Sequence, residues 1–373
     1  MAHSGSAVFV LPLILAGCGV SPAVTEAPRA PAPVVVSAGT QAASATAAAT
    51  PEPAPPPAPE PIRARFLSVG DVIFGRRVQK VIDEKGDPEH PFRPLAKLYA
   101  EVDFTFANLE NPFFSGKKPN VTPPGKRYAV LWARPEHAAT LVKYRFTAVN
   151  LANNHAMDQD LRGLQETLRT LDAAGVQHTG VGMDLDAAWT PMIVDVRGLR
   201  IGFVGASYAS RNDMGFSRNA HVARIEDEAR LAAACRKARE GAHFVVATMH
   251  AGDEHSFVPD AKQRAFAAAA VRAGADVVIG AHPHVVQPAE KIEGRWVFYS
   301  LGNFVFDQAA ADNREAVAVE IRLALPPGAA RAAIEKLVLH PVQIEESAPT
   351  PADDARAARI LTRLGVAARE IAP

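Results

Sequence analysis

Five short stretches of the chain carry side chains that can bind a metal ion. They are Gly70-Asp71, Asn108-Leu109-Glu110, Asn153-Asn154-His155, His250 and Gly280-Ala281-His282-Pro283-His284. Imidazole and carboxylate groups together suit Zn, Mn or Fe, whereas Mg and Ca prefer sites made of oxygen alone. The amide oxygen of Asn154 could complete such a set, and His155 could stay uncoordinated and act as a general acid. These residue types predict a site for one or two divalent metal ions.

The positions of these stretches along the chain indicate that they meet in space. Each follows a short apolar run of strand-like composition, and these runs are Phe66–Val69, Phe104–Ala107, Phe146–Leu151, Phe244–Met249 and Val277–Ile279. In an open α/β sheet, ligands bind at the carboxyl ends of the strands. The metal ligands that we expect there are Asp71, Glu110, Asn154, His250, His282 and His284.

Taken singly, most of these residues have a simpler interpretation. Asp71 could belong to an ordinary turn after its strand. The amide side chain of Asn154 could cap the helix predicted to follow it, and His250 could be a buried histidine with ordinary hydrogen bonds. The two imidazoles that flank Pro283 form the most specific fragment. The conjunction of all five stretches is what favours the metal site.

The rest of the folded chain supplies the elements that must position these residues. Strand-like and helical runs alternate from Ile62, and Leu161–Ala174 is a helix that Gly175 ends. Cys235 lies in a predicted helix, Glu228–Glu240, where a packed thiol is expected rather than a nucleophile. Runs near 296–300, 317–325 and 334–342 lack helices between them, which indicates a second, more antiparallel sheet before a closing helix within 351–370. We expect an α/β fold of two packed sheets flanked by helices, in one domain over residues 62–373.

The first 61 residues have the composition of a targeting segment and a tether. Ala7–Leu15 is too short to span a membrane, and it leads into Leu15-Ala16-Gly17-Cys18, which resembles a bacterial lipobox. We expect a lipoprotein signal peptide over residues 1–18 with lipid on Cys18; an ordinary secretory signal is the alternative. Residues 19–61 contain eleven prolines and no apolar periodicity, which predicts a disordered Pro/Ala-rich tether. The folded domain would then be held at a membrane of the cell envelope, outside the cytoplasm.

The overall charge argues against one class of partner. The chain contains 40 basic and 40 acidic residues, so its formal net charge is zero. Binding to nucleic acid needs a basic face that offsets phosphate charge, and this balance gives no support for such a face. We therefore expect no nucleic-acid partner.

The motifs of residues 65–308 resemble those of the CapA (PgsA-type) family of capsule and poly-γ-glutamate synthesis proteins. This family is related to the calcineurin-like metallophosphoesterases. The stretches that carry the resemblance are 68–71 (SVGD), 107–110 (ANLE), 151–158 (LANNHAMD), 250–254 (HAGDE), 280–285 (GAHPHV) and 299–307 (YSLGNFVFD). They cover most of the folded part in the right order, and the last is highly specific.

The resemblance implies a four-layer α/β/β/α fold with a metal centre between the tops of two sheets. It implies two metal sites that share Glu110. Asp71 and His284 would complete the first site, and the second would be completed by Asn154, His250 and His282. His155 is the implied proton donor to the leaving oxygen. Glu254 is the second residue that we expect to be catalytic. Glu254 and Asn303 match family positions near the site, where either could orient a ligand or a water.

Two positions depart from the phosphoesterase pattern. Ile73 stands where that pattern has a histidine, and Glu110 replaces an aspartate at the bridging position. The first metal site has therefore lost an imidazole, and the chain could bind one metal ion rather than two. Phosphoesterase activity does not follow from the fold alone.

Two functions of different classes fit these features. The leading hypothesis is an envelope-anchored, metal-dependent hydrolase-like protein. It would use a metal-activated water in the synthesis, transfer or release of an extracellular anionic polymer, poly-γ-glutamate or a capsular polysaccharide. The alternative is a non-catalytic scaffold or export subunit of a membrane synthase complex, which Ile73 favours; a simple phosphomonoesterase ranks third. The cations that could contact an anionic polymer are Arg76, Arg77, Lys126, Arg127 and Arg211.

Overall fold

The computed structural model describes residues 59–116, 129–208 and 219–373. The predicted signal peptide, Cys18 and the predicted tether up to residue 58 lie outside the described residues, as do Lys126, Arg127 and Arg211. The described chain falls within one compact unit, Ala58–Pro373. No helix in these described ranges is long and apolar enough to cross a membrane.

The larger sheet joins the first part of the folded chain to its last third. Its strand order is β14-β13-β12-β1-β2-β3-β4, and β11 pairs with β1 while β15 pairs with β13. Strands β1 to β4 are parallel, whereas β12, β13 and β14 are antiparallel to their neighbours. The strands are β1 Ile62–Val72, β2 Phe104–Leu109, β3 Ala148–Asn150, β4 Gln177–Thr179, β11 Asn303–Val305, β12 Glu315–Leu325, β13 Ala333–Glu345, β14 Ala348–Pro351 and β15 Glu370–Ile371.

The smaller sheet comes from the middle of the chain. Its order is β5-β6-β7-β8-β10-β9. Strands β6, β7, β8 and β10 are parallel, and β5 and β9 are antiparallel strands at the two edges. The strands are β5 Met192–Val196, β6 Leu199–Ser207, β7 Phe244–His250, β8 Val277–Ala281, β9 Ala289–Ile292 and β10 Arg295–Phe298.

The late strands do not form a sheet of their own, so that prediction is wrong. β12 pairs with β1 along most of its length, from Leu325 beside Ile62 to Val319 beside Ser68, and β10 joins the other sheet in parallel with β8. Nearly every residue of β12 is buried, which suits a strand inside a sheet that is covered on both faces. The spacing of apolar residues in the sequence carries no information on which neighbour such a strand selects.

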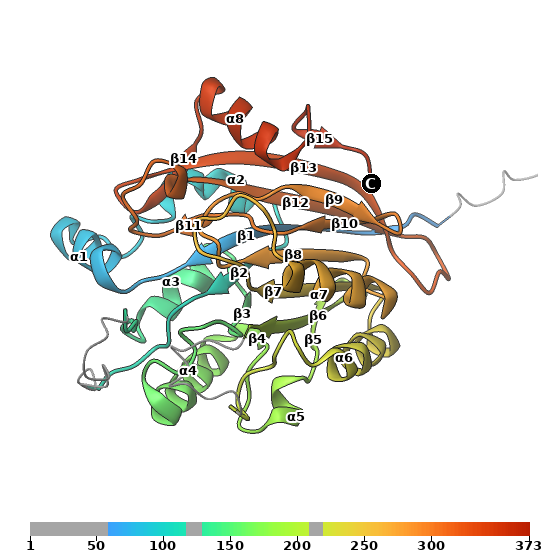
Figure 1. The fold of residues 1–373 in the computed structure, drawn as a ribbon, viewed down its shortest axis with the longest axis horizontal. Helices are drawn as coiled ribbons and strands as arrows, with labels where there is room; N and C mark the ends of the chain where they lie inside the picture. The colour runs from blue at the N-terminus through green and yellow to red at the C-terminus, as the bar shows by residue number, and fades with distance from the viewer. Residues whose placement is uncertain (1–58, 117–128, 209–218) are drawn as a thin grey trace, which may run out of the picture. The chain divides into compact units, whose positions relative to one another are not determined.

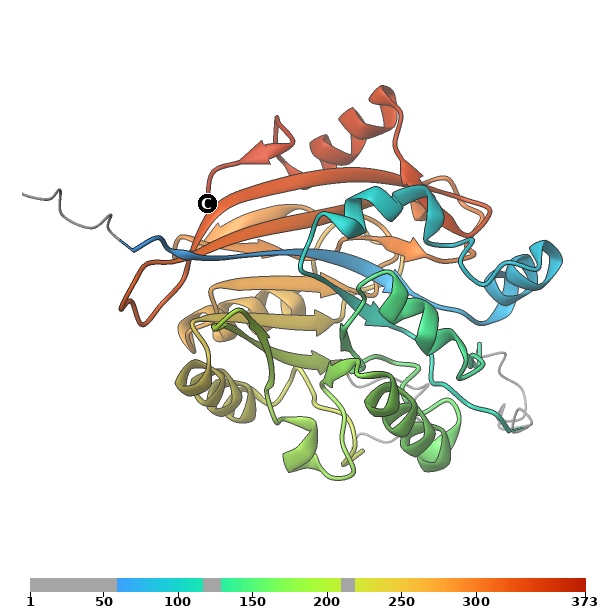
Figure 2. The same ribbon diagram turned by 180° about the vertical axis from the view of Figure 1, so that it is seen from behind.

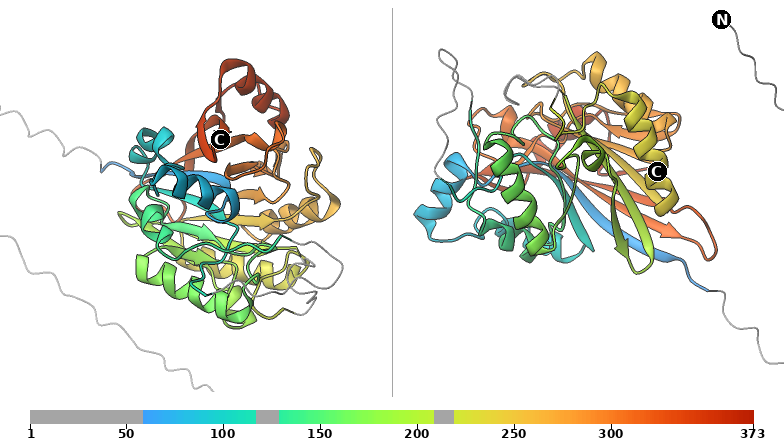
Figure 3. Two further views of the ribbon diagram at one scale, coloured as in Figure 1. Left: turned by 90° about the vertical axis from the view of Figure 1, so that its left-hand side faces the viewer. Right: turned by 90° about the horizontal axis from the view of Figure 1, so that it is seen from below.

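Helices cover the outer face of each sheet, except that the last helix packs on the inner face of β12 and β13, against the core between the sheets. Figure 3, in the view from below, shows α3 and α4 in green on one side, α6 and α7 in yellow on the other, and the strands of both sheets between them. The opposite views in Figures 1 and 2 show the same order. The helices are α1 Arg76–Lys85, α2 Ala96–Ala100, α3 His137–Lys143, α4 Asp160–Ala174, α5 Leu185–Ala188, α6 Glu228–Gly241, α7 Ala261–Arg272 and α8 Asp354–Leu364. The predicted four-layer α/β/β/α sandwich is confirmed.

Three apolar cores correspond to the three interfaces between the layers. Between the sheets, the rings of Phe106 and Phe203 stack with centroids 4.6 Å apart. Helix α4 ends at Gly175, whose φ of 74° is left-handed as expected for a helix-capping glycine. Cys235 is fully buried in α6, so the expected packed thiol is confirmed. α8 is shorter than the closing segment predicted over 351–370.

Candidate metal centre

The ends of strands from both sheets bring the expected ligands together. Asp71 lies near the end of β1, Glu110 directly follows β2, and His250 is the last residue of β7. The loops after β3 and β8 supply the remaining members, which are Asn154, His155, His282 and His284. Every one of these side chains is buried. The apolar runs that each lead into a polar residue therefore bring these side chains into one buried cluster.

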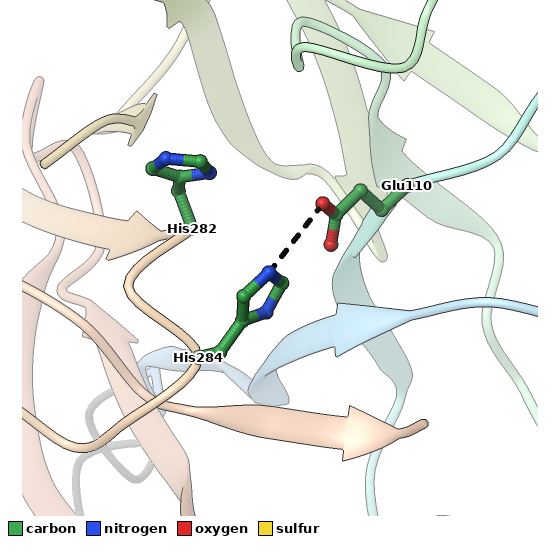
Figure 4. Close-up of side chains that lie close together, drawn as sticks. All are labelled: Glu110, His282 and His284. Atoms are coloured by element: carbon green, nitrogen blue, oxygen red, sulfur yellow. Dashed lines mark ion pairs between the residues drawn. The ribbon is translucent and has the colours of Figure 1, made fainter. Parts of the chain in front are cut away.

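Glu110 lies at the middle of this cluster. Its Oε1 is 3.7 Å from Nε2 of His250, 3.8 Å from Nε2 of His155 and 4.0 Å from Nε2 of His284. One ligand atom from each of Glu110, His282 and His284 lies within 4.8 Å of the others. Figure 4 shows the carboxylate facing the two imidazoles across this space. These separations are too long for hydrogen bonds and fit side chains that share a cation.

The carboxylate of Glu110 fits a divalent cation. Both of its oxygens are buried, and among the residues that the structure describes they have no hydrogen-bond partner. Burial, and next the negative charge of Asp71, raise the pKa of Glu110 to about 8. A buried polar group without a partner is unfavourable in a folded protein, and a cation would supply the missing interaction. The mixture of carboxylate, amide and imidazole fits Zn, Mn or Fe.

His250 and His282 are kept neutral, which is the form that binds metal. Burial lowers the pKa of both side chains well below the usual value, and neighbouring imidazoles add to the effect. Nε2 of His250 lies 2.8 Å from Oδ1 of Asn154 and 3.1 Å from Nδ1 of His282. Three expected ligands of the second metal site are thus in direct contact.

Unlike His250 and His282, His284 has a raised pKa. Burial alone would lower its pKa, but Glu110 and then Asp71 outweigh burial and raise the pKa to about 9. Its Nδ1 lies 2.8 Å from Oδ1 of Asn303, so Asn303 orients the ring. The loop that carries His284 is strained, since His282 and His284 have φ of 100° and 58°. Such left-handed backbone in non-glycine residues concentrates at functional sites.

Asn108, for which the sequence alone predicts no role, links the ligands of the two sheets. Its Nδ2 donates to Oδ1 of Asp71 at 2.8 Å and contacts Nδ1 of His250 at 3.0 Å. Its own Oδ1 accepts from Asn150 at 2.9 Å. A Cβ at Gly205 would lie 2.1 Å from Oδ1 of Asn150, so a glycine there makes room for this chain of amides. The sequence feature that could have identified Asn108 is its two-residue spacing from Glu110, because side chains two residues apart in an extended chain point to the same face.

His155 has a carboxylate partner. Its Nδ1 lies 2.6 Å from Oδ2 of Asp158, three residues along the chain. Burial, the largest single influence, lowers the pKa of His155, but the charge and hydrogen bond of Asp158 outweigh it and raise the pKa. The raised pKa favours the protonated ring, whose Nε2 lies 3.8 Å from Oε1 of Glu110. Such a group can donate a proton to a leaving atom.

Glu254, which is expected to be catalytic, and Ile73, which stands where the phosphoesterase pattern has a histidine, both lie apart from the cluster. Glu254 is exposed in the loop between β7 and α7, and within the described ranges no hydrogen bond or ion pair joins it to the buried ligands. Its catalytic role stays a prediction. Ile73 is fully buried in the core beneath the helices, and its backbone N–H donates to the carbonyl of Val305 at 2.9 Å. The imidazole absent at this position is replaced by a core side chain.

The architecture and this buried cluster define a two-sheet α/β protein whose polar strand ends converge on a candidate metal centre. The chain belongs to the family described as bacterial capsule synthesis protein PGA_cap, whose sequence pattern matches residues 65–308. The predicted family is thereby confirmed.

Two relatives and one solved structure illustrate the similarity. The PGA biosynthesis protein CapA of Bacillus subtilis is 32% identical over 76% of this chain and 72% of its own length. The capsule biosynthesis protein CapA of Bacillus anthracis is 30% identical over 77% of this chain and 69% of its own length. A 5′-nucleotidase precursor from Thermus thermophilus aligns with 13% identity and a TM-score of 0.45, over 82% of this chain and 58% of that one.

Proposed function

We propose that this protein acts in the synthesis, transfer or release of an extracellular anionic polymer, through hydrolysis or transfer at an ester or amide bond. The polymer would be poly-γ-glutamate or a capsular polysaccharide, in keeping with the names of the two Bacillus relatives. The observation that carries the proposal is the buried carboxylate of Glu110, which has no hydrogen-bond partner within the described ranges and faces three imidazoles. This arrangement is suited to a catalytic cation and has no evident use as a structural core.

The side chains divide into a metal-holding set and a proton donor. The residues that would hold metal are Asp71, Glu110, Asn154, His250, His282 and His284. A bound divalent cation would polarise the attacked group and favour attack by water. His155 would hold the proton at Nε2 and deliver it to the leaving atom, while Asp158 fixes the ring through Nδ1. Asn108 and Asn303 would orient Asp71, His250 and His284 from behind.

The metal content of the purified full chain tests this proposal. We expect one or two equivalents of divalent metal in the wild-type protein and a clear decrease in His282→Ala, because His282 would lose its ligand nitrogen. His178→Ala is the matched control, since His178 lies on β4 and pairs with Asp172. Elemental analysis after purification without chelators provides the measurement.

A non-catalytic scaffold or export subunit of a synthase complex is the second candidate. The buried Ile73 favours it, because a core side chain takes the place of an imidazole. Absence of metal from the wild-type protein would contradict the catalytic proposal and support the scaffold. Equal metal content in wild type and His282→Ala would contradict the assigned ligand set.

We also propose that the folded domain is held at a membrane through lipid on Cys18. The Cys18→Ser variant should then move from the membrane fraction to the soluble fraction, because its acyl chains would be lost. Cell fractionation and incorporation of a labelled fatty acid measure this. Cys235→Ala is the control, since that thiol is fully buried in α6. A wild-type chain that takes up no label would refute the lipid anchor.

A further inference from the structure

A pocket of about 300 Å³ opens beside the start of α1. Gly75, Arg76, Gln79, Val130 and Trp132 line it. A Cβ at Gly75 would lie 2.4 Å from the carbonyl oxygen of Trp132, so only glycine lets these two segments approach so closely. The indole of Trp132 is half-buried. The pocket therefore combines a guanidinium with an aromatic and an aliphatic wall.

Arg76 has an unfavourable backbone conformation, and contacts with its side chain hold it in place. Its φ of 53° lies in the left-handed region, which disfavours side chains other than glycine. The carboxylate of Asp307 accepts from Nε at 3.0 Å, from Nη2, and from the backbone N–H of Arg77 at 3.0 Å. The guanidinium also lies over the ring of Phe306, 5.4 Å from its centroid. An arginine fixed so firmly in a conformation suited to glycine indicates that its side chain is required there.

The pocket adjoins the candidate metal centre. The ring of Phe306, on which Arg76 rests, lies 4.9 Å from the ring of His284. A polymer unit seated in the pocket would have its neighbouring bond close to the buried ligands.

One nitrogen of the Arg76 guanidinium, Nη1, makes no hydrogen bond to any residue that the structure describes. Within the described part of the chain, the hydrogen bonds of the guanidinium use Nε and Nη2, which leaves the two N–H groups of Nη1. Because Asp307 already offsets the charge of Arg76, one singly charged acceptor suits this position better than a doubly charged phosphate. Trp132 and Val130 can cover the carbon skeleton of such a group.

We propose that this pocket binds a carboxylate-bearing repeat unit of an anionic polymer, with the carboxylate at Nη1 of Arg76 and the carbon skeleton against Trp132. The inference rests on the proposed function, since it places this unit beside the bond that reacts. It assigns Arg76 and Trp132 as determinants of substrate specificity.

Calorimetric titration of the full chain tests this assignment. The probes are a γ-linked glutamate pentamer, an oligogalacturonate, and the methyl ester of each. We expect the free acid of one oligomer to bind, and Arg76→Gln to weaken that binding about ten- to a hundredfold, as for the loss of a charge-assisted hydrogen bond. Lys80→Gln, which removes a positive charge from the exposed side of α1, should bind like the wild type. The preferred oligomer identifies the carboxylate's source, an amino acid or a sugar.

A second variant covers the case in which Arg76→Gln misfolds because Asp307 loses its partner. Trp132→Ala leaves that ion pair intact and should weaken binding about tenfold. Unchanged affinity in both variants, equal binding of acids and esters, or no binding by the wild type would each overturn the subsite. Metal content is measured on the same samples and should not change in either variant. A wild-type protein that contains no metal but loses oligomer binding in these variants would refute the proposed function and leave the subsite standing.

Discussion

The Glu110→Gln variant is expected to lose bound metal and activity, while its metal-free form becomes more stable than the metal-free wild type at pH 9. Burial and Asp71 raise the pKa of Glu110 from 4.5 to about 8. The folded metal-free protein thus retains a proton that the unfolded chain releases, and its stability falls as the pH rises between these two values. Above pH 8 the wild type must bury a charge that glutamine does not carry. We expect the variant to gain about 2 kcal/mol there.

Urea unfolding of chelator-treated proteins at pH 6 and pH 9 measures this effect, and elemental analysis measures the metal. The pKa of His284, raised to about 9, acts in the same direction, because the proton that stabilises the folded state is lost as the pH rises through that value. Glu240→Gln, on the exposed end of α6, is the control and should change neither quantity. A Glu110→Gln protein that keeps its metal, or that is less stable than wild type at pH 9, would contradict the role given to Glu110.

Replacement of His155 by alanine is expected to reduce turnover of the polymer about 10²- to 10⁴-fold, the usual contribution of a general acid. Metal content should be unchanged, because His155 is the proton donor and not a ligand. Asp158→Asn should act more subtly. Without the negative charge of Asp158, burial would dominate and the pKa of His155 would fall. The alkaline limb of the pH–rate profile would then move to lower pH.

Rates measured across a pH series for wild type, His155→Ala and Asp158→Asn separate these effects. The exposed Asp172→Asn variant on α4 is a matched control, since it also removes a carboxylate beside a histidine. A profile for Asp158→Asn that coincides with the wild type would remove Asp158 from the mechanism. Loss of metal from His155→Ala would instead place His155 among the ligands.

The sequence predicts the parts of the fold that depend on local composition. The alternation of apolar runs and helices yields the two packed sheets, and Gly175 marks a helix end that the structure confirms. Strand pairing across long separations is a different problem. β12 lies beside β1 although about 250 residues separate them in the chain, because burial on both faces favours the interior of a sheet. No feature of the residues 315–325 themselves identifies that partner.

In the candidate site, likewise, the sequence identifies some residues and not others. His282 and His284 could be recognised because two imidazoles beside a proline are chemically conspicuous. The spacing of Asn108 and Glu110 indicates that both point to one side, but the role of Asn108 depends on simultaneous contacts with Asp71 and His250, which lie in different sheets. Glu254 lies close to His250 in sequence, but the loop after β7 carries it to the surface. Short sequence motifs identify candidate residues, whereas only the three-dimensional structure shows which of them lie in contact.

The strand that carries Asp71 is also the strand by which the folded unit joins the preceding chain. β1 runs without interruption from Ile62 to Val72, and a strand advances about 3.3 Å per residue, so about 30 Å separate Ile62 from Asp71. Ile62, where the chain enters the folded unit, and the candidate metal centre therefore lie at opposite ends of β1. A domain restrained through its beginning would therefore present the centre on the side that faces away from its point of attachment.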